Sequence, residues 1–270
     1  MSFKIGFTAP VENEKEIFVQ KEEKCFDTPA RKSLVDVYFA ERNMTLTYFN
    51  DSFDLKEGDI VFVEGKLEGC RGNVMRVVYN FKIKLSQYKK VISVANTHVG
   101  GEFYTVGSHL VTSNPTAVPY TKVKTWFAPL GDEEEFIVGE GGGHEFNIND
   151  LKGMKISPEK AERGYDYYMQ NRVLYIEVVD GHGRALVQGS EIYEVNFLLE
   201  NGNVKNITCS CFCTDECKHE FAVMLELSEI LKILSENEIN IHPDRYFACV
   251  QKRLVYEYVL GGKNVKKVVL

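Results

Sequence analysis

The chain has 270 residues, of which 44% are hydrophobic and 26% are charged, and its formal net charge is −7. This composition is ordinary for a soluble globular protein, and the negative charge argues against indiscriminate binding to polyanions. No run of about 18 apolar residues occurs, so we expect no membrane-spanning helix and no membrane partner.

Cysteine usage points to metal binding rather than to disulfides. Of the seven cysteines, Cys25, Cys70 and Cys249 are scattered singly, and the others crowd into one short stretch. A secreted disulfide scaffold would distribute its cysteines differently. The first residues also lack the basic start and the apolar stretch of a secretory signal, so we expect a cytoplasmic protein.

Residues 1–128 are predicted to form an all-β, barrel-like domain. Apolar and polar residues alternate over residues 34–39 and 44–49, which are rich in β-branched and aromatic side chains. Many short strands with glycine and asparagine between them, and no clear helix, are typical of a small barrel or sandwich. The other strand-like runs are residues 55–65, 69–78, 91–95, 103–106 and 109–112.

Part of this domain has a family pattern. The run from Gly58 to Val74 resembles SH3-like barrels of the KOW type, and the wider run from Val35 to Val74 resembles PSP1-type domains. The physical interpretation is the same under either name. Gly58-Asp59 makes a turn into a strand, residues such as Ile60 and Phe62 face the core, and the glycines permit tight corners.

A basic and aromatic stretch, residues 71–90, is the candidate nucleic-acid-binding segment. It contains three aromatic residues and no acidic residue. Basic side chains can follow phosphates while aromatic rings stack on bases. The other interpretation is a strand whose outward face is basic and whose aromatic residues fill the core. The basic residues of the stretch are Arg71, Arg76, Lys82, Lys84, Lys89 and Lys90.

Charge and composition divide the chain near its middle. Residues 55–124 hold ten basic and five acidic residues, whereas residues 153–235 hold eight basic and thirteen acidic ones. The first half is therefore the better candidate for contact with nucleic acid. Between them, residues 129–152 are acidic and glycine-rich, which predicts a flexible linker.

Residues 153–235 are predicted to form a small α+β domain. Ser157 is the expected N-cap of a helix with Pro158 at its first position, ending near Gln170-Asn171. Ala161, Tyr165 and Tyr168 lie at helical spacing and indicate a buried stripe. A meander of four strands follows, with Asn201-Gly202 as a strong hairpin signal, and a second helix begins after His219.

The stretch between that meander and the second helix contains the metal-binding pattern. Cys209-x-Cys211 and Cys217-x-His219 supply three thiolates and one imidazole, a set that suits one tetrahedral structural Zn²⁺. Buried, reduced cysteines without a metal are the alternative interpretation, but such dense spacing is rare without one. Cys213 offers a rival pair with Cys211. We expect Cys209 to be the ligand, because the longer loop from Cys211 strains the chain less.

The region from about Gly153 to Ser235 resembles the SWIM-type zinc finger domain. The family pattern of Cys-x-Cys, a variable spacer and Cys-x-His is met by Cys209, Cys211, Cys217 and His219, and the flanking segments are similar as well. The resemblance implies a zinc-stabilised fold and binding to DNA or protein.

The end of the chain, residues 236–270, is predicted to be a C-terminal helix and tail. The pattern from Asp244 to Leu260 indicates an amphipathic helix, ended by Gly261-Gly262. Residues 266–270 indicate a short edge strand. The predicted fold class is therefore α+β, with a barrel-like first domain and a zinc-stabilised second domain.

We expect a non-enzymatic protein with no catalytic residues and no small-molecule substrate. A catalytic zinc typically uses His-Glu-x-x-His and an open coordination position, and His219-Glu220 supplies only the first two letters. The other histidines are isolated in sequence. The predicted function is binding to nucleic acid, to DNA in preference to RNA. The alternative is a protein-interaction adaptor acting through the acidic half, and a thiol or metal enzyme using an open zinc site or a reactive Cys213 is a third.

Overall fold

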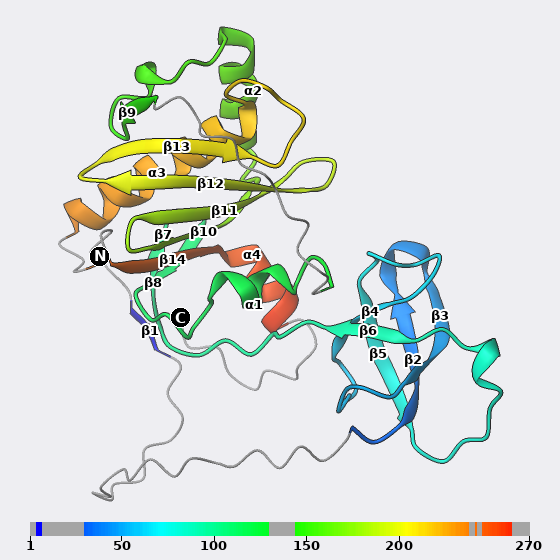
Figure 1. Ribbon diagram of the computed structural model, residues 1–270. Coiled ribbons are helices and arrows are strands. Elements are labelled where there is room, and N and C mark those ends of the chain that lie inside the picture. The colour runs from blue at the N-terminus through cyan, green and yellow to red at the C-terminus, as the bar shows by residue number, and fades with distance from the viewer. Residues whose placement is uncertain (1–3, 7–29, 130–143, 238–240, 242–244, 261–270) are drawn as a thin grey trace, which may run out of the picture. The chain divides into compact units, whose positions relative to one another are not determined.

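The computed structural model describes two compact units of mixed α and β structure (Figure 1), which agrees with the broad class predicted. Each unit contains one antiparallel sheet. Most of the predicted linker and the predicted edge strand at residues 266–270 lie outside the described residues. The described residues are 4–6, 30–129, 144–237, 241 and 245–260.

The smaller unit, residues 30–96 and 125–129, contains a five-stranded sheet in the order β3-β2-β5-β4-β6. Val35, Val37 and Phe39 are fully buried on one face, as their alternation with polar residues predicts. The strands are β2 (Ser33–Phe39), β3 (Met44–Asn50), β4 (Ile60–Val63), β5 (Gly72–Val78) and β6 (Val91–Val94), with short 3₁₀ turns η1 (Ala40–Arg42) and η2 (Leu85–Gln87).

The prediction of a barrel is wrong, because the described strands of this sheet do not close. The edge strands β3 and β6 meet through one isolated bridge, between Phe49 and Lys90, in place of a ladder. β4 and β6 have only four residues each, whereas closure needs strands long enough to tilt and stagger around an axis. Two strands expected in the barrel, at residues 103–106 and 109–112, belong to the other sheet.

The larger unit contains a nine-stranded sheet in the order β1-β7-β8-β14-β10-β11-β12-β13-β9. Its strands are β1 (Lys4–Gly6), β7 (Glu102–Val106), β8 (His109–Thr112), β9 (Glu145–Asn147), β10 (Val173–Val179), β11 (His182–Gln188), β12 (Ile192–Glu200), β13 (Asn203–Cys209) and β14 (Tyr246–Gln251). Its helical segments are α1 (Tyr120–Lys124), η3 (Leu151–Gly153), α2 (Pro158–Met169), α3 (Lys218–Glu236), α4 (Lys252–Leu254) and the π-helix η4 (Val255–Leu260).

The predicted four-strand meander is confirmed as β10 to β13, which pair in succession. Both residues of the turns Asp180-Gly181 and Asn201-Gly202 have positive φ angles, between 48° and 82°. This is the conformation of two-residue type I′ hairpins, which asparagine, aspartate and glycine favour. The last strand ends at Cys209, so the meander delivers the first residue of the metal-binding pattern.

The amphipathic helix predicted from Asp244 to Leu260 is wrong in its first half. Residues 246–251 form strand β14, which pairs with β8 on one side and with β10 on the other. Four consecutive residues of this strand are fully buried, because other segments cover both faces of the sheet there. They are Phe247, Ala248, Cys249 and Val250. A short run that is apolar on both faces has no periodicity to separate a strand from a helix. Helical structure begins only at Lys252.

The two faces of the large sheet are covered by different segments. Helix α3 lies against one face of the sheet (Figure 1). Ile176 and Val178 of β10 belong to the core cluster that residues of α3 also join. Tyr175 and Glu177 alternate with them and therefore point to the other face, where the Tyr175 hydroxyl donates to the Val118 carbonyl. The segment that leads into α1 thus covers the second face. None of the helices in the described part of the chain is long and apolar enough to cross a membrane.

Helix α2 begins as predicted, but it packs differently. The Ser157 side chain accepts a hydrogen bond from the Lys160 backbone N–H, and Pro158 is the first helical residue. The predicted buried stripe is wrong at Tyr165, which is 51% exposed. Gly164 is buried instead, because a Cβ there would lie 2.9 Å from the Lys218 carbonyl oxygen at the start of α3. The absent side chain lets the two helices approach closely.

Gly164→Ala is therefore expected to destabilise the protein by about 1–3 kcal/mol, the usual cost of forcing a methyl group into a packed contact. The sign of this change in stability is informative, because alanine normally stabilises a helix interior by about 1 kcal/mol relative to glycine. Urea unfolding followed by circular dichroism measures the change. Glu162→Ala, at an exposed position of the same helix, is the matched control. A Gly164→Ala protein more stable than the parent would contradict the close approach.

Candidate metal centre

The four predicted zinc ligands come together where β13 leads into α3. Cys209 is the last residue of β13, Cys211 follows in the loop, Cys217 is the N-cap of α3, and His219 lies in the first turn of that helix. One ligand atom from each residue lies within 4.8 Å of the other three. Cys217 and His219 are buried, and Cys209 and Cys211 are half-buried. The cluster could hold one metal ion.

The two nitrogen–sulfur distances known within the cluster are close to those of a tetrahedral zinc site. Zn–S bonds of about 2.3 Å and Zn–N bonds of about 2.0–2.1 Å place a ligating sulfur and nitrogen about 3.5–3.6 Å apart in that geometry. The Nδ1 atom of His219 lies 3.6 Å from the Cys209 Sγ and 3.8 Å from the Cys217 Sγ. The sulfurs therefore face Nδ1, and this nitrogen is the one that would bind the metal.

Aromatic rings hold the His219 imidazole in place. The Tyr193 ring stacks on it, with a centroid distance of 4.2 Å and an interplanar angle of 19°, and the Tyr167 ring contacts it edge-on at 5.3 Å. The Nε2 atom is buried and has no hydrogen-bond partner. Metal-bound histidines usually donate the second ring N–H to an oxygen atom, which fixes the ring. Here the packing of Tyr167 and Tyr193, on α2 and β12, takes over that role.

The start of α3 is fixed by its own third residue. The Glu220 carboxylate accepts a hydrogen bond of 2.7 Å from the Cys217 backbone N–H, which is the reciprocal half of a capping box. Burial raises the pKa of Glu220 to about 7. The positive end of the helix dipole also lies here, where it favours the thiolates of a loaded site. The spacing Cys-x-x-Glu, a cysteine version of the capping box, is a sequence signal that could have identified Glu220.

Burial governs the protonation of the cluster without a bound metal. It lowers the pKa of His219 to about 4 and raises the pKa of Cys211 to about 11. A hydrogen bond with Cys209, followed by burial, raises the pKa of Cys217 well above its ordinary value. At neutral pH the imidazole and these two thiols are therefore uncharged. Binding of Zn²⁺, which requires thiolates, displaces their protons.

Cys213 lies outside the four-ligand cluster. It is exposed, whereas Cys209, its predicted competitor, is one of the four residues brought together. The residue before it, Phe212, is 100% exposed at the end of the loop. The structure thus groups the pair Cys209 and Cys211 with Cys217 and His219.

The histidines outside the cluster have separate surroundings. His109 is the first residue of β8, and the Oγ atom of Ser108, which precedes the strand, lies 3.0 Å from the His109 Nδ1. The Glu226 carboxylate lies 2.9 Å from the same nitrogen, and Nε2 faces the Val173 carbonyl oxygen. A Ser-His-acid triad needs the serine and the acid on opposite ring nitrogens, so this arrangement is not one. His242 lies outside the described residues.

Two of the six candidate nucleic-acid-binding residues are paired with acidic side chains. Arg76 on β5 lies 2.8 Å from Asp36, and Lys90 lies 2.8 Å from Asp51. These ion pairs link segments within the smaller unit. They also neutralise part of the positive charge that could otherwise bind a phosphate. Arg71 is half-buried.

The other three, Lys82, Lys84 and Lys89, are exposed. They lie in the irregular segment between β5 and β6 that contains η2, and the predicted basic strand therefore does not exist as one continuous strand. Of the aromatic residues, Phe81 packs edge-on against Phe49, as the core interpretation of the stretch expects. Tyr79 is 38% exposed and carries the guanidinium of Arg31 at 4.1 Å from its ring centroid. Some side chains of residues 71–90 therefore pack within the smaller unit, and others are exposed and charged.

No protein-family model, curated protein or solved structure matches the chain. The resemblance to the SWIM-type zinc finger therefore depends on the residues of this chain and stays a prediction.

Proposed function

We propose that this chain is a non-enzymatic zinc protein of the SWIM type, in which one structural Zn²⁺ joins the meander to α3. The observation that supports the metal is the cluster of Cys209, Cys211, Cys217 and His219, whose ligand atoms lie within 4.8 Å of one another. Four protein ligands fill a tetrahedral shell and leave no position for a substrate or a water nucleophile. The metal then has a structural role, and the function of the protein depends on a ligand that binds to another part of the chain.

The proposed ligand of the smaller unit is nucleic acid, with DNA preferred over RNA. The observation that carries this proposal is the group of exposed lysines Lys82, Lys84 and Lys89, in a stretch with no acidic residue. Arg31 and Tyr79 add a stacked cation and a partly exposed ring. Lysines contact phosphates without reading sequence, so the expected binding is electrostatic and depends strongly on salt.

Replacing Lys82, Lys84 and Lys89 together by alanine is expected to weaken binding and to flatten its salt dependence. Each lost phosphate contact removes about 0.9 from the slope of log K against log salt on duplex DNA and about 0.7 on single strands. The triple variant should therefore lower the slope by about 2–3. Fluorescence anisotropy with single-stranded DNA, duplex DNA and RNA over a salt titration measures both quantities.

The matched control removes three exposed lysines from the larger unit, Lys152, Lys155 and Lys232, with the same change in net charge. It should bind as the parent chain does. Equal losses for the two triple variants would mean that only net charge matters. If the parent chain binds none of the three nucleic acids at low salt, the proposal fails.

A protein partner for the acidic half is the second candidate function. The observation that favours it is Phe212, a fully exposed aromatic residue in the loop between Cys211 and Cys213. A bound metal would restrain this loop through Cys211, and exposed aromatic residues are frequent anchors at protein interfaces. Under this alternative Phe212→Ala weakens association with the partner, and the three lysines are irrelevant.

A further inference from the structure

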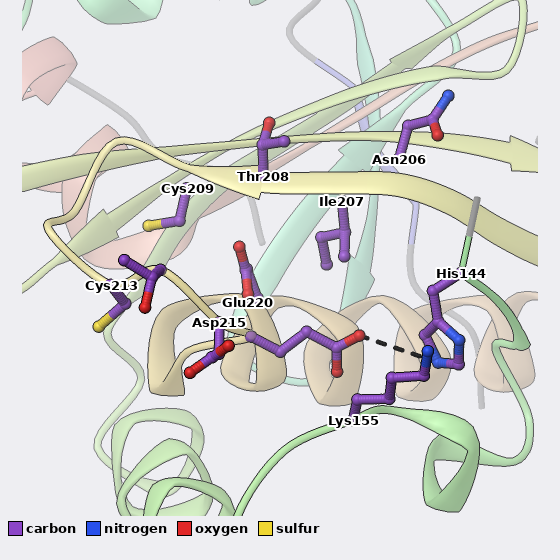
Figure 2. A pocket seen from close by; sticks show the side chains of 11 residues that line it. His144, Lys155, Asn206, Ile207, Thr208, Cys209, Cys213, Asp215 and Glu220 are labelled. Carbon is purple, nitrogen blue, oxygen red and sulfur yellow. Dashed lines mark ion pairs between the residues drawn. The ribbon is translucent and has the colours of Figure 1, made fainter. Parts of the chain in front are cut away.

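We infer that Cys213 is a transient ligand that receives the incoming metal ion and passes it to the four-ligand cluster. Cys213 and Cys209 both line a cavity of about 410 Å³ between β13 and the loop that leads to α3 (Figure 2). The cavity is therefore lined both by a residue of the cluster and by the exposed Cys213. This inference depends on the zinc-binding part of the proposed function and not on the nucleic-acid part.

The sulfurs are arranged in order of exposure. Cys213 is exposed, Cys209 and Cys211 are half-buried, and Cys217 is 1% exposed. His219, the remaining ligand, is 3% exposed. The Cys209 and Cys213 side chains both influence the pKa of Cys211, so the outer thiol lies near the cluster. An ion from solvent meets the outer sulfurs before it reaches the two inner ligands.

Acidic side chains outnumber basic ones around the same cavity. Asp215, Glu216 and Glu220 supply three carboxyl groups, and the basic side chains are Lys155 and His144, whose Nε2 atom lies 3.9 Å from Glu216. The Asp215 side chain is 78% exposed, and Glu216 has a buried Oε2 atom with no hydrogen-bond partner. A cleft in which one sign of charge predominates raises the local concentration of the opposite ion and its association rate. The carboxylates and the outer thiol thus act at the same entrance.

Ligand exchange at Zn²⁺ completes the transfer without any redox step. The ion first binds the Cys213 and Cys211 sulfurs, and each thiol releases its proton to solvent. Bonds to Cys209, Cys217 and His219 then form, while the bond to Cys213 breaks and this thiol regains a proton. The final site holds three thiolates and one neutral imidazole, the set that tetrahedral zinc prefers. Cys213 therefore affects rates and leaves the equilibrium affinity unchanged.

The test is a stopped-flow measurement of metal loading on the full chain after its metal has been removed. Co²⁺ is the probe, because its bonds to thiolates give a strong absorbance. Cys213→Ser and Cys213→Ala should each slow loading about tenfold, the lower end of what a charged cleft contributes to association rates. Because the Kd is unchanged, release to an excess of chelator should slow by the same factor. Asp215→Asn should slow loading without changing the final absorbance spectrum.

Cys70→Ser is the matched control, because it removes one thiol from the smaller unit and leaves the cavity intact. It should load at the parent rate. Parent-like loading by both Cys213 variants would overturn the inference while the zinc site stands. A Kd raised about 10- to 100-fold in either variant would also overturn it, because losses of that size show that a residue supports the bound metal at equilibrium. If the parent chain binds neither Co²⁺ nor Zn²⁺, the zinc-binding part of the proposed function fails with it.

Discussion

Cys217→Ser is expected to abolish zinc binding and to lower the stability of the larger unit by at least about 4 kcal/mol, the gain from a ligand present at about 1,000 times its Kd. This loss corresponds to a fall in the melting temperature of about 10 °C for a unit of this size. Cys217 is the most buried of the three cluster sulfurs, and it also caps α3. Metal analysis and calorimetry of purified protein measure the two effects.

The comparison with Cys213→Ser makes this result specific. Both substitutions remove one thiol from the same loop, but Cys213 lies outside the four-ligand cluster. We expect the Cys213→Ser protein to keep one zinc and the parent melting temperature. A Cys217→Ser protein that retains its zinc and unfolds at the parent temperature would show that the four side chains are ordinary packing residues.

The metal centre was largely predictable because its information is local. Cys209 to His219 are eleven consecutive residues, and a short loop confines their ligand atoms whatever the rest of the chain does. The meander that leads to it was predictable for the same reason. Asn201-Gly202 and Asp180-Gly181 favour the positive φ angles of tight hairpins, and the strands next to such turns must pair with each other.

The surroundings of the centre were not predictable from sequence, because they depend on contacts between distant segments. Tyr167 on α2 and Tyr193 on β12 reach His219 from separate elements, and no spacing rule relates them. The residues next to Gly164 in the sequence are those of an ordinary helix. Only the close approach of α3 requires position 164 to lack a side chain. Such close contacts arise from packing density, which a one-dimensional pattern does not record.

The strand order of the large sheet could not be predicted either, because it also depends on contacts between distant segments. β8 pairs with β14 through contacts such as Val111 with Cys249, between residues far apart in the chain. The hairpin β7–β8 has the alternation of any short antiparallel pair, so its sequence fits the smaller sheet equally well. What distinguishes it is His109, a buried polar residue whose partner is on α3. A buried histidine needs such a partner, and this need ties the hairpin to the larger unit.

Glu226→Ala is expected to cost about 1–3 kcal/mol, the usual effect of leaving a buried polar group without its hydrogen-bond partner. The side chains of His109 and Glu226 are 0% and 5% exposed, and their Nδ1 and Oε1 atoms lie 2.9 Å apart. Without the carboxylate, His109 keeps only its contacts with Ser108 and with the Val173 carbonyl oxygen. Urea unfolding monitored by circular dichroism gives the change in unfolding free energy.

Two further variants separate the pair from the general effect of truncation. Glu236→Ala, on the same helix but with its side chain 61% exposed, should change the unfolding free energy by less than about 1 kcal/mol, as surface ion pairs do. The double variant of His109→Leu and Glu226→Leu should recover most of the loss, because two apolar side chains leave no uncompensated group in the core. If Glu226→Ala proves no more harmful than Glu236→Ala, the pair does not hold the β7–β8 hairpin against α3. The hairpin would then depend on its strand pairing with β14 and with β1.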